Sequence, residues 1–155
     1  MSALPQTISS SLTDYYHMIQ TRVHELVQPL STEQIWHHPY RYGNSIGNLL
    51  LHLTGNLSFY IGAQIAGSGY ERHRDREFTD SGNSKEEVLA EFDQAIEMVV
   101  KTIKNQSADD WSAAYSAAGT QATVRFNMVL SCAGHAYHHV GQIIYLQKEL
   151  TRAAR

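Results

Sequence analysis

The sequence of 155 residues contains only one cysteine, three prolines and no run of basic residues. A single cysteine cannot form an intramolecular disulfide, so the fold has no disulfide framework. The net charge is −3, from 12 Lys and Arg against 15 Asp and Glu. This balance lacks the basic surface that nucleic acid or an anionic membrane attracts. We therefore expect neither nucleic acid nor a membrane as a partner.

A long hydrophobic run is also missing. The best candidate, residues 46–65, is interrupted by Asn48, His52, Asn56 and several glycines, whereas a membrane span needs about 18 apolar residues. The first residues, Met-Ser-Ala-Leu-Pro, do not follow the charged and then apolar layout of a signal peptide. We expect a cytoplasmic protein, and the length predicts one domain over residues 1–155.

Hydrophobic residues recur at three- and four-residue steps in four segments, which is the pattern of amphipathic helices that face a common core. The expected helices cover about residues 12–29, 46–66, 85–103 and 126–148. Residues 115–124, with Gly119 near their centre, break this pattern and predict a short extended or hairpin-like segment. The sequence therefore predicts an all-α fold, a four-helix bundle, in which metal or cofactor sites lie on facing helices.

Residues 71–77, Glu-Arg-His-Arg-Asp-Arg-Glu, carry charges of alternating sign. Such a run is typical of a solvated loop whose charges compensate one another. We expect a solvated loop here rather than a basic patch.

Histidine is abundant, with nine in the chain. His135 and His139 are four residues apart on the expected fourth helix, so they project from one face, about 40° from each other. On the second helix, which is apolar nearly all round, Asn48, His52 and Asn56 form a narrow polar stripe. His52 alone would be interpreted as a hydrogen-bonded core residue, because buried polar groups need partners. Two buried polar stripes in one small core favour a common ligand.

Together, His52, His135 and His139 supply three imidazoles, and three protein ligands with an open position are typical of catalytic metal sites. Zinc or nickel suits imidazole ligands, and iron, manganese and cobalt are also compatible with them. Cys132, one turn before His135, is a further candidate ligand, although a packed core thiol is the commoner role. His138 has three interpretations: it lines a pocket, replaces His135 as ligand, or bonds to a backbone group.

Polar residues near these histidines are expected to support the site. Asn48, Asn56 and Gln142 lie one or two turns from a ligand and would orient ligands or substrate, and His138 is counted with them as a pocket residue. The spacing is not His-Glu-x-x-His, so the general base of the metalloproteases is missing. Because coordination to a metal deprotonates a thiol, thiol chemistry needs no such base. This favours transfer chemistry over peptide hydrolysis.

Three stretches carry a family resemblance: Asn44-Ser-Ile-Gly-Asn-Leu-Leu-Leu-His52-Leu-Thr-Gly-Asn56, Asp75-Arg-Glu-Phe78, and His135-x-x-x-His139-x-Gly-Gln142. In this order they resemble the DinB/YfiT superfamily of metalloenzymes, and more narrowly its short members of unknown function. The resemblance implies a bundle in up-down-down-up order, a nickel or zinc site at His52, His135 and His139, and frequent homodimers. Better-known relatives use thiols: transferases use bacillithiol and isomerases use mycothiol, while others carry only a hydrolase label.

Two functions of different class follow. The first is a metal-dependent enzyme acting on a small molecule, of the thiol S-transferase or hydrolase type, with a low-molecular-weight thiol as a candidate cosubstrate. The second is a non-catalytic bundle that a metal stabilises and that acts through dimerisation or partner binding. We favour the first, because an open three-ligand site is a costly structural device.

Overall fold

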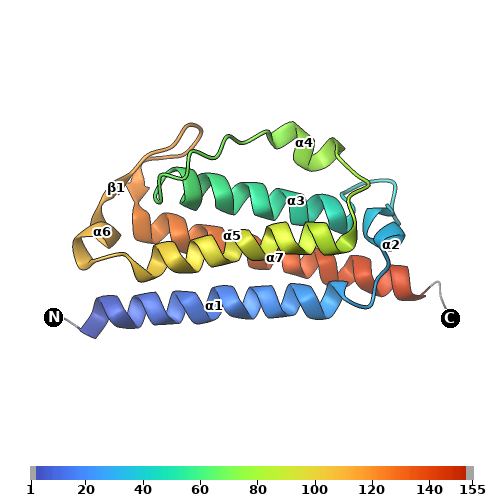
Figure 1. Ribbon diagram of the computed structural model, residues 1–155, viewed down its shortest axis with the longest axis horizontal. Coiled ribbons are helices and arrows are strands. Elements are labelled where there is room, and N and C mark those ends of the chain that lie inside the picture. The colour runs from blue at the N-terminus through green and yellow to red at the C-terminus, as the bar shows by residue number, and fades with distance from the viewer. Residues whose placement is uncertain (1–2, 153–155) are drawn as a thin grey trace.

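Four long helices pack side by side in the computed structural model, which describes residues 3–152 (Figure 1). They are α1 (Ala3–Val27), α3 (Ile46–Leu57), α5 (Lys85–Lys104) and α7 (Arg125–Arg152). A π-helical turn, η1 (Ser58–Ala63), extends α3, and three short helices lie in the connections: α2 (Thr32–Trp36), α4 (Arg74–Thr79) and α6 (Ala108–Ser112). Before α7, β1 (Ala114–Tyr115) pairs antiparallel with β2 (Thr123–Val124). The predicted all-α fold with a short hairpin-like segment is confirmed.

Local sequence signals set where the helices begin and end. At the start of α5, the Ser84 hydroxyl accepts the Glu87 backbone N–H at 3.2 Å, and the Glu87 carboxylate accepts the Ser84 N–H at 2.8 Å. This capping box satisfies two backbone donors that the helix leaves free. Ser45 caps α3 by accepting the backbone N–H of Asn48 at 3.1 Å. Helix α1 ends just before Pro29, which has no N–H to continue it.

The core lies between the four long helices, because α1 and α3 each pack against both α5 and α7. Fully buried side chains come from every one of these helices: Tyr16, Ile19 and Val23; Leu50 and Leu53; Phe92, Ile96 and Val99; and Ile143. Burial of each large apolar side chain stabilises the fold by about 1.5–3 kcal/mol relative to exposure. The Tyr16 hydroxyl donates to the carbonyl oxygen of Val129 at 2.8 Å, which ties α1 to α7. The up-down-down-up order stays a prediction.

Helix α4 lies outside the four-helix core and packs along α3 (Figure 1). The expectation of a solvated loop at residues 71–77 is wrong in two respects. Residues 74–77 belong to helix α4, and two residues are shielded from solvent, since Glu77 is buried and the Arg72 side chain is only 9% exposed. Asn48 fixes α4 in place, since its Nδ2 donates to the carbonyl oxygens of Glu77 and Asp80, each at 3.1 Å. The alternating charges do not reveal this docking, because the partners lie on another helix.

No helix within residues 3–152 is long and apolar enough to cross a membrane.

Candidate metal centre

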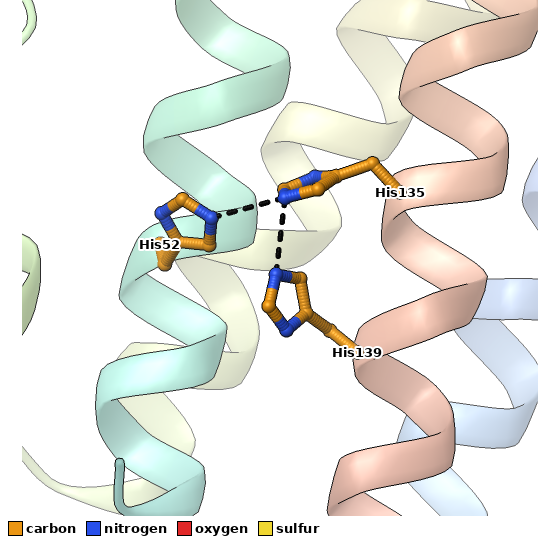
Figure 2. A group of neighbouring side chains, drawn as sticks. All are labelled: His52, His135 and His139. Atoms are coloured by element: carbon orange, nitrogen blue, oxygen red, sulfur yellow. Dashed lines mark hydrogen bonds between the residues drawn. The ribbon is translucent and has the colours of Figure 1, made fainter. Parts of the chain in front are cut away.

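Three histidines meet between α3 and α7 (Figure 2). His52 projects from α3, and His135 and His139 project from α7, one turn apart. The Nε2 atom of His135 lies 3.2 Å from Nε2 of His52 and 3.0 Å from Nε2 of His139. One nitrogen from each ring lies within 4.8 Å of the others. The fold thus brings together the three histidines that helical spacing singles out in the sequence.

The separations between these nitrogens fit ligands around a single ion. A zinc–imidazole bond is about 2.0–2.1 Å long, so two ligand nitrogens lie about 3.3 Å apart around a tetrahedral ion. Around an octahedral ion with bonds of the same length they lie about 2.9 Å apart. The observed 3.0 and 3.2 Å fall between these values. Two of the three nitrogen pairs therefore have the spacing expected around one divalent cation, and the third pair, His52 and His139, lies within 4.8 Å.

Two of the rings are held with their Nε2 lone pairs pointing inward. The Nδ1–H of His52 donates to Glu77 Oε2 at 2.8 Å, and the Nδ1–H of His139 donates to Gln142 Oε1 at 2.7 Å. Both partners are acceptors, so each neutral ring carries its proton on Nδ1 and leaves Nε2 unprotonated. If Nε2 of His135 carries a proton, that one proton can satisfy the Nε2 lone pairs of His52 and His139 only in part. A cation between the rings can instead accept a lone pair from all three Nε2 atoms.

The third ring, His135, differs from the other two, because within residues 3–152 no acceptor fixes its tautomer. Its Nδ1 is buried and has no hydrogen-bond partner within the described residues. Burial, followed by the positive charge that the neighbouring histidines would carry, lowers the pKa of His135 to about 4. Burial likewise lowers the pKa of His139, although its bond to Gln142 acts in the opposite direction. Both rings are therefore neutral near pH 7, which is the form that binds metals.

A buried ion pair supports His52 from behind. Arg72 donates through Nε to Glu77 Oε1 at 2.7 Å and through Nη2 to Oε2 at 2.9 Å. Burial raises the pKa of Glu77, but the hydrogen bonds from His52 and Arg72, together with the Arg72 charge, outweigh it and leave the pKa below its ordinary value. The carboxylate is therefore ionised at neutral pH. A carboxylate bonded to the far nitrogen of a histidine orients the ring and makes it a better metal ligand.

Sequence reasoning missed both Glu77 and Arg72. The alternating charges around them suggested solvent, although residues 75–78 belong to the stretches that carry the family resemblance. A second signal was Gly55, because a glycine inside a buried helix marks a close approach. A Cβ atom at Gly55 would collide with the Glu77 carboxylate. This glycine is what allows the carboxylate to reach His52.

The other polar residues expected around the site take different positions. Gln142 bonds to His139, whereas Asn48 acts on α4 by binding its backbone. Asn56 is buried, and its Oδ1 has no hydrogen-bond partner in the described part of the chain. His138 is exposed, and its ring centroid lies 5.2 Å from that of His139. His138 thus stands beside the three converging rings and not among them.

Cys132 packs in the core and stands apart from the histidine cluster. Its Sγ lies 3.9 Å from the Met128 sulfur, and burial raises the pKa of the thiol to about 12. Its sulfur does not belong to the group of side chains whose ligand atoms converge, so the structure does not place Cys132 as a metal ligand. The packed-thiol interpretation therefore fits the structure.

The helical bundle has the fold of a DinB-like protein. The structure is similar to a DinB-like protein from Bacillus cereus ATCC 10987, with a TM-score of 0.73 and 11% identity over 90% of this chain and 91% of that one. It is also similar to a conserved protein from Enterococcus faecalis, with a TM-score of 0.77 and 13% identity over 92% of this chain and 96% of that one. These identities establish the fold alone.

Residues 6–154 match the family model described as protein of unknown function DUF1572, and the chain belongs to that family. No curated protein matches the chain. The predicted resemblance to the DinB/YfiT superfamily, in its branch of unknown function, is thereby confirmed.

Proposed function

We propose that the protein binds one divalent metal ion through His52, His135 and His139 and acts as a metal-dependent enzyme on a small molecule. The observation that carries this proposal is the convergence of three Nε2 atoms, two of which have their lone pairs fixed inward by Glu77 and Gln142. Zinc or nickel suits this all-imidazole set best, and iron, manganese or cobalt is compatible with it.

The donor set favours a thiol S-transferase or a related hydrolase. Three protein ligands leave at least one position for substrate, where a divalent ion lowers the pKa of a thiol or water. Glu77 is the one buried carboxylate near the histidines within residues 3–152. It is engaged by His52 and Arg72 and faces away from the converging nitrogens. It is therefore unsuited to serve as a general base. A thiol that loses its proton on coordination needs no base, which favours a low-molecular-weight thiol as cosubstrate.

The same proposal includes the domain organisation, location and oligomeric state of the enzyme. We propose one domain over residues 1–155, a cytoplasmic location and a homodimer. The dimer is supported by the family resemblance and by the half-exposed apolar side chains of Leu130 and Tyr137 on α7. Light scattering on the purified protein tests it, and a monomer at micromolar concentration would contradict it.

A thiol-transfer assay tests the enzymatic part. Protein loaded with zinc or nickel is mixed with a panel of low-molecular-weight thiols and the electrophile monobromobimane. In the reaction a C–S bond forms, the C–Br bond breaks, and bromide and the thiol proton are released. We expect catalysis by wild type, its loss in His139→Ala, and its retention in the matched control His17→Ala, since His17 is an exposed histidine of α1.

The same assay separates the two functions predicted from the sequence. If the protein retains its metal but consumes no thiol beyond the uncatalysed rate, and hydrolyses no ester when one is offered in place of monobromobimane, the enzyme proposal is wrong. The metal-stabilised, non-catalytic bundle is then the better account.

A further inference from the structure

A pocket of about 440 Å³ lies beside the histidine cluster, between residues 40–44, α3 and the C-terminal half of α7. Its size is within the range of sites for small molecules, about 300–1,000 Å³. We call it the tyrosine pocket. Its main lining side chains are Tyr40, Tyr42, Tyr145, Leu146, His138 and Gln142.

The tyrosine pocket is joined to the proposed metal centre through two of its lining residues. Gln142 lines the pocket and also accepts the Nδ1–H of His139 at 2.7 Å. His138 lines the pocket as well, and its ring centroid is 5.2 Å from that of His139. A molecule in the tyrosine pocket therefore lies against the residues that surround one of the proposed ligands.

Aromatic side chains form the rim of the pocket. The rings of Tyr40 and Tyr42 stack with an interplanar angle of 12° and centroids 5.8 Å apart. Tyr42 is 80% exposed and Tyr145 is 73% exposed. Tyrosine offers a large, rigid contact surface at a small cost in side-chain entropy. Exposed rings that flank a concave surface are thus well suited to stack on a planar ligand.

Among residues 3–152, His138 is the one basic side chain in the lining. Within residues 3–152, no side chain of Asp, Glu, Lys or Arg lines the tyrosine pocket. Lys148 is outside the lining, with its Nζ 6.0 Å from the centroid of the Tyr145 ring. In the metal-free protein, an anionic group that entered the pocket would give up part of its hydration without a Lys or Arg partner in the lining, which is unfavourable. The lining therefore selects against anionic ligands.

We infer that the tyrosine pocket binds the planar, uncharged aromatic part of the small-molecule substrate. The placement of that substrate beside a metal rests on the proposed function, whereas the binding of an uncharged aromatic group rests on the pocket alone. A carboxylate-bearing cosubstrate is disfavoured by the same lining.

A matched pair of probes tests the inference: 2-naphthylmethanol, which is neutral, and 2-naphthoate, which is anionic. Binding to the metal-free full chain is measured by calorimetry. We expect 2-naphthylmethanol to bind once per chain and more tightly than 2-naphthoate. Affinity for the alcohol should fall about threefold to tenfold in Tyr42→Ala and in Tyr145→Ala, the loss typical of one aromatic contact. Tyr70→Ala is the control, because Tyr70 is an exposed tyrosine between η1 and α4 that lies outside the pocket lining.

Two outcomes would overturn the inference. One is an affinity for 2-naphthoate equal to or above that for the alcohol. The other is an affinity for the alcohol that neither Tyr42→Ala nor Tyr145→Ala changes relative to Tyr70→Ala. Circular dichroism shows that each variant is folded.

A third probe separates this inference from the proposed function. The thiol 2-naphthylmethanethiol should bind more tightly than the alcohol only after zinc loading, because the metal holds a thiolate. If the tyrosine variants weaken alcohol binding but zinc is not taken up, the tyrosine pocket stands and the metalloenzyme proposal fails. If zinc is bound but the alcohol is not, the metal-binding part of the proposed function stands and the inference about the tyrosine pocket fails.

Discussion

Glu77 Oε2 lies 2.8 Å from Nδ1 of His52, so a helix outside the four-helix core holds a side chain of the candidate site. The carboxylate is itself held by Arg72 through two hydrogen bonds. Phe78, the next residue of α4, packs against the His52 ring with centroids 5.1 Å apart. Helix α4 therefore fixes both the orientation of the His52 ring and the position of its proton.

Substitution of Glu77 should weaken metal binding without unfolding the protein. In Glu77→Gln the side chain keeps its size but loses the charge that orients His52 and makes it more basic. Loss of such a partner typically costs 10- to 100-fold in metal affinity. We expect a loss of about that size for zinc, measured by competition with a chromophoric chelator.

The control for this prediction is Asp80→Asn, because Asp80 is an exposed carboxylate at the end of the same helix, paired with Arg76. Its zinc affinity should match that of wild type. Equal affinities in Glu77→Gln and Asp80→Asn would show that the carboxylate behind His52 has no part in metal binding.

A methyl group at Gly55 should disturb the same contact from the opposite side. Its Cβ would collide with the Glu77 carboxylate, and overpacking of a filled core typically costs about 1–3 kcal/mol. We expect Gly55→Ala to lower the free energy of unfolding by that amount, measured by urea denaturation, and to weaken zinc binding as well.

Gly134 provides the matched control, since it is an exposed glycine of α7 with no atom within 4 Å of an added Cβ. Gly134→Ala should stabilise the protein by up to about 1 kcal/mol, because alanine favours the helix. The packing of Glu77 against α3 would be wrong if Gly55→Ala were as stable as Gly134→Ala.

The stability of the metal-free protein should rise with pH between about 4 and 6.5. The pKa of His135 is about 4 in the folded protein, against an ordinary value of 6.5, chiefly because of burial. In that window the unfolded chain binds more protons than the folded chain, so acid favours unfolding. We expect urea midpoints in EDTA to rise from pH 5 to pH 7 and to level off above it.

His135→Gln should reduce this dependence on pH, whereas His17→Gln, which alters an exposed histidine, should leave it unchanged. The measurements are made above pH 5 so that protonation of Glu77 does not contribute to the slope, since its pKa lies below its ordinary value of 4.5. A slope in His135→Gln equal to that of wild type would contradict the assignment of a half-buried, neutral imidazole at this position.

Much of the fold could be predicted, and so could the three histidines, because helical periodicity indicates both the helices and the faces on which the histidines lie. His135 and His139 share a face by their spacing alone, and His52 stands out as a polar residue on a nearly apolar helix. Glu77 and Arg72 could not be found in this way, because their burial depends on the docking of α4 onto α3. The tyrosine pocket escapes prediction for a similar reason: residues 40–44 and Tyr145 are distant in the sequence and meet only in the folded chain.

The most direct test of the central claim is the metal content of protein purified without a histidine tag. Wild type is compared with His52→Ala, His135→Ala and His139→Ala, and with His138→Ala as the control, since His138 lies beside the cluster but outside it. We predict one divalent ion per chain in wild type and His138→Ala, and its loss in the other three variants. A folded wild type that contains no metal and takes up neither zinc nor nickel would contradict the account.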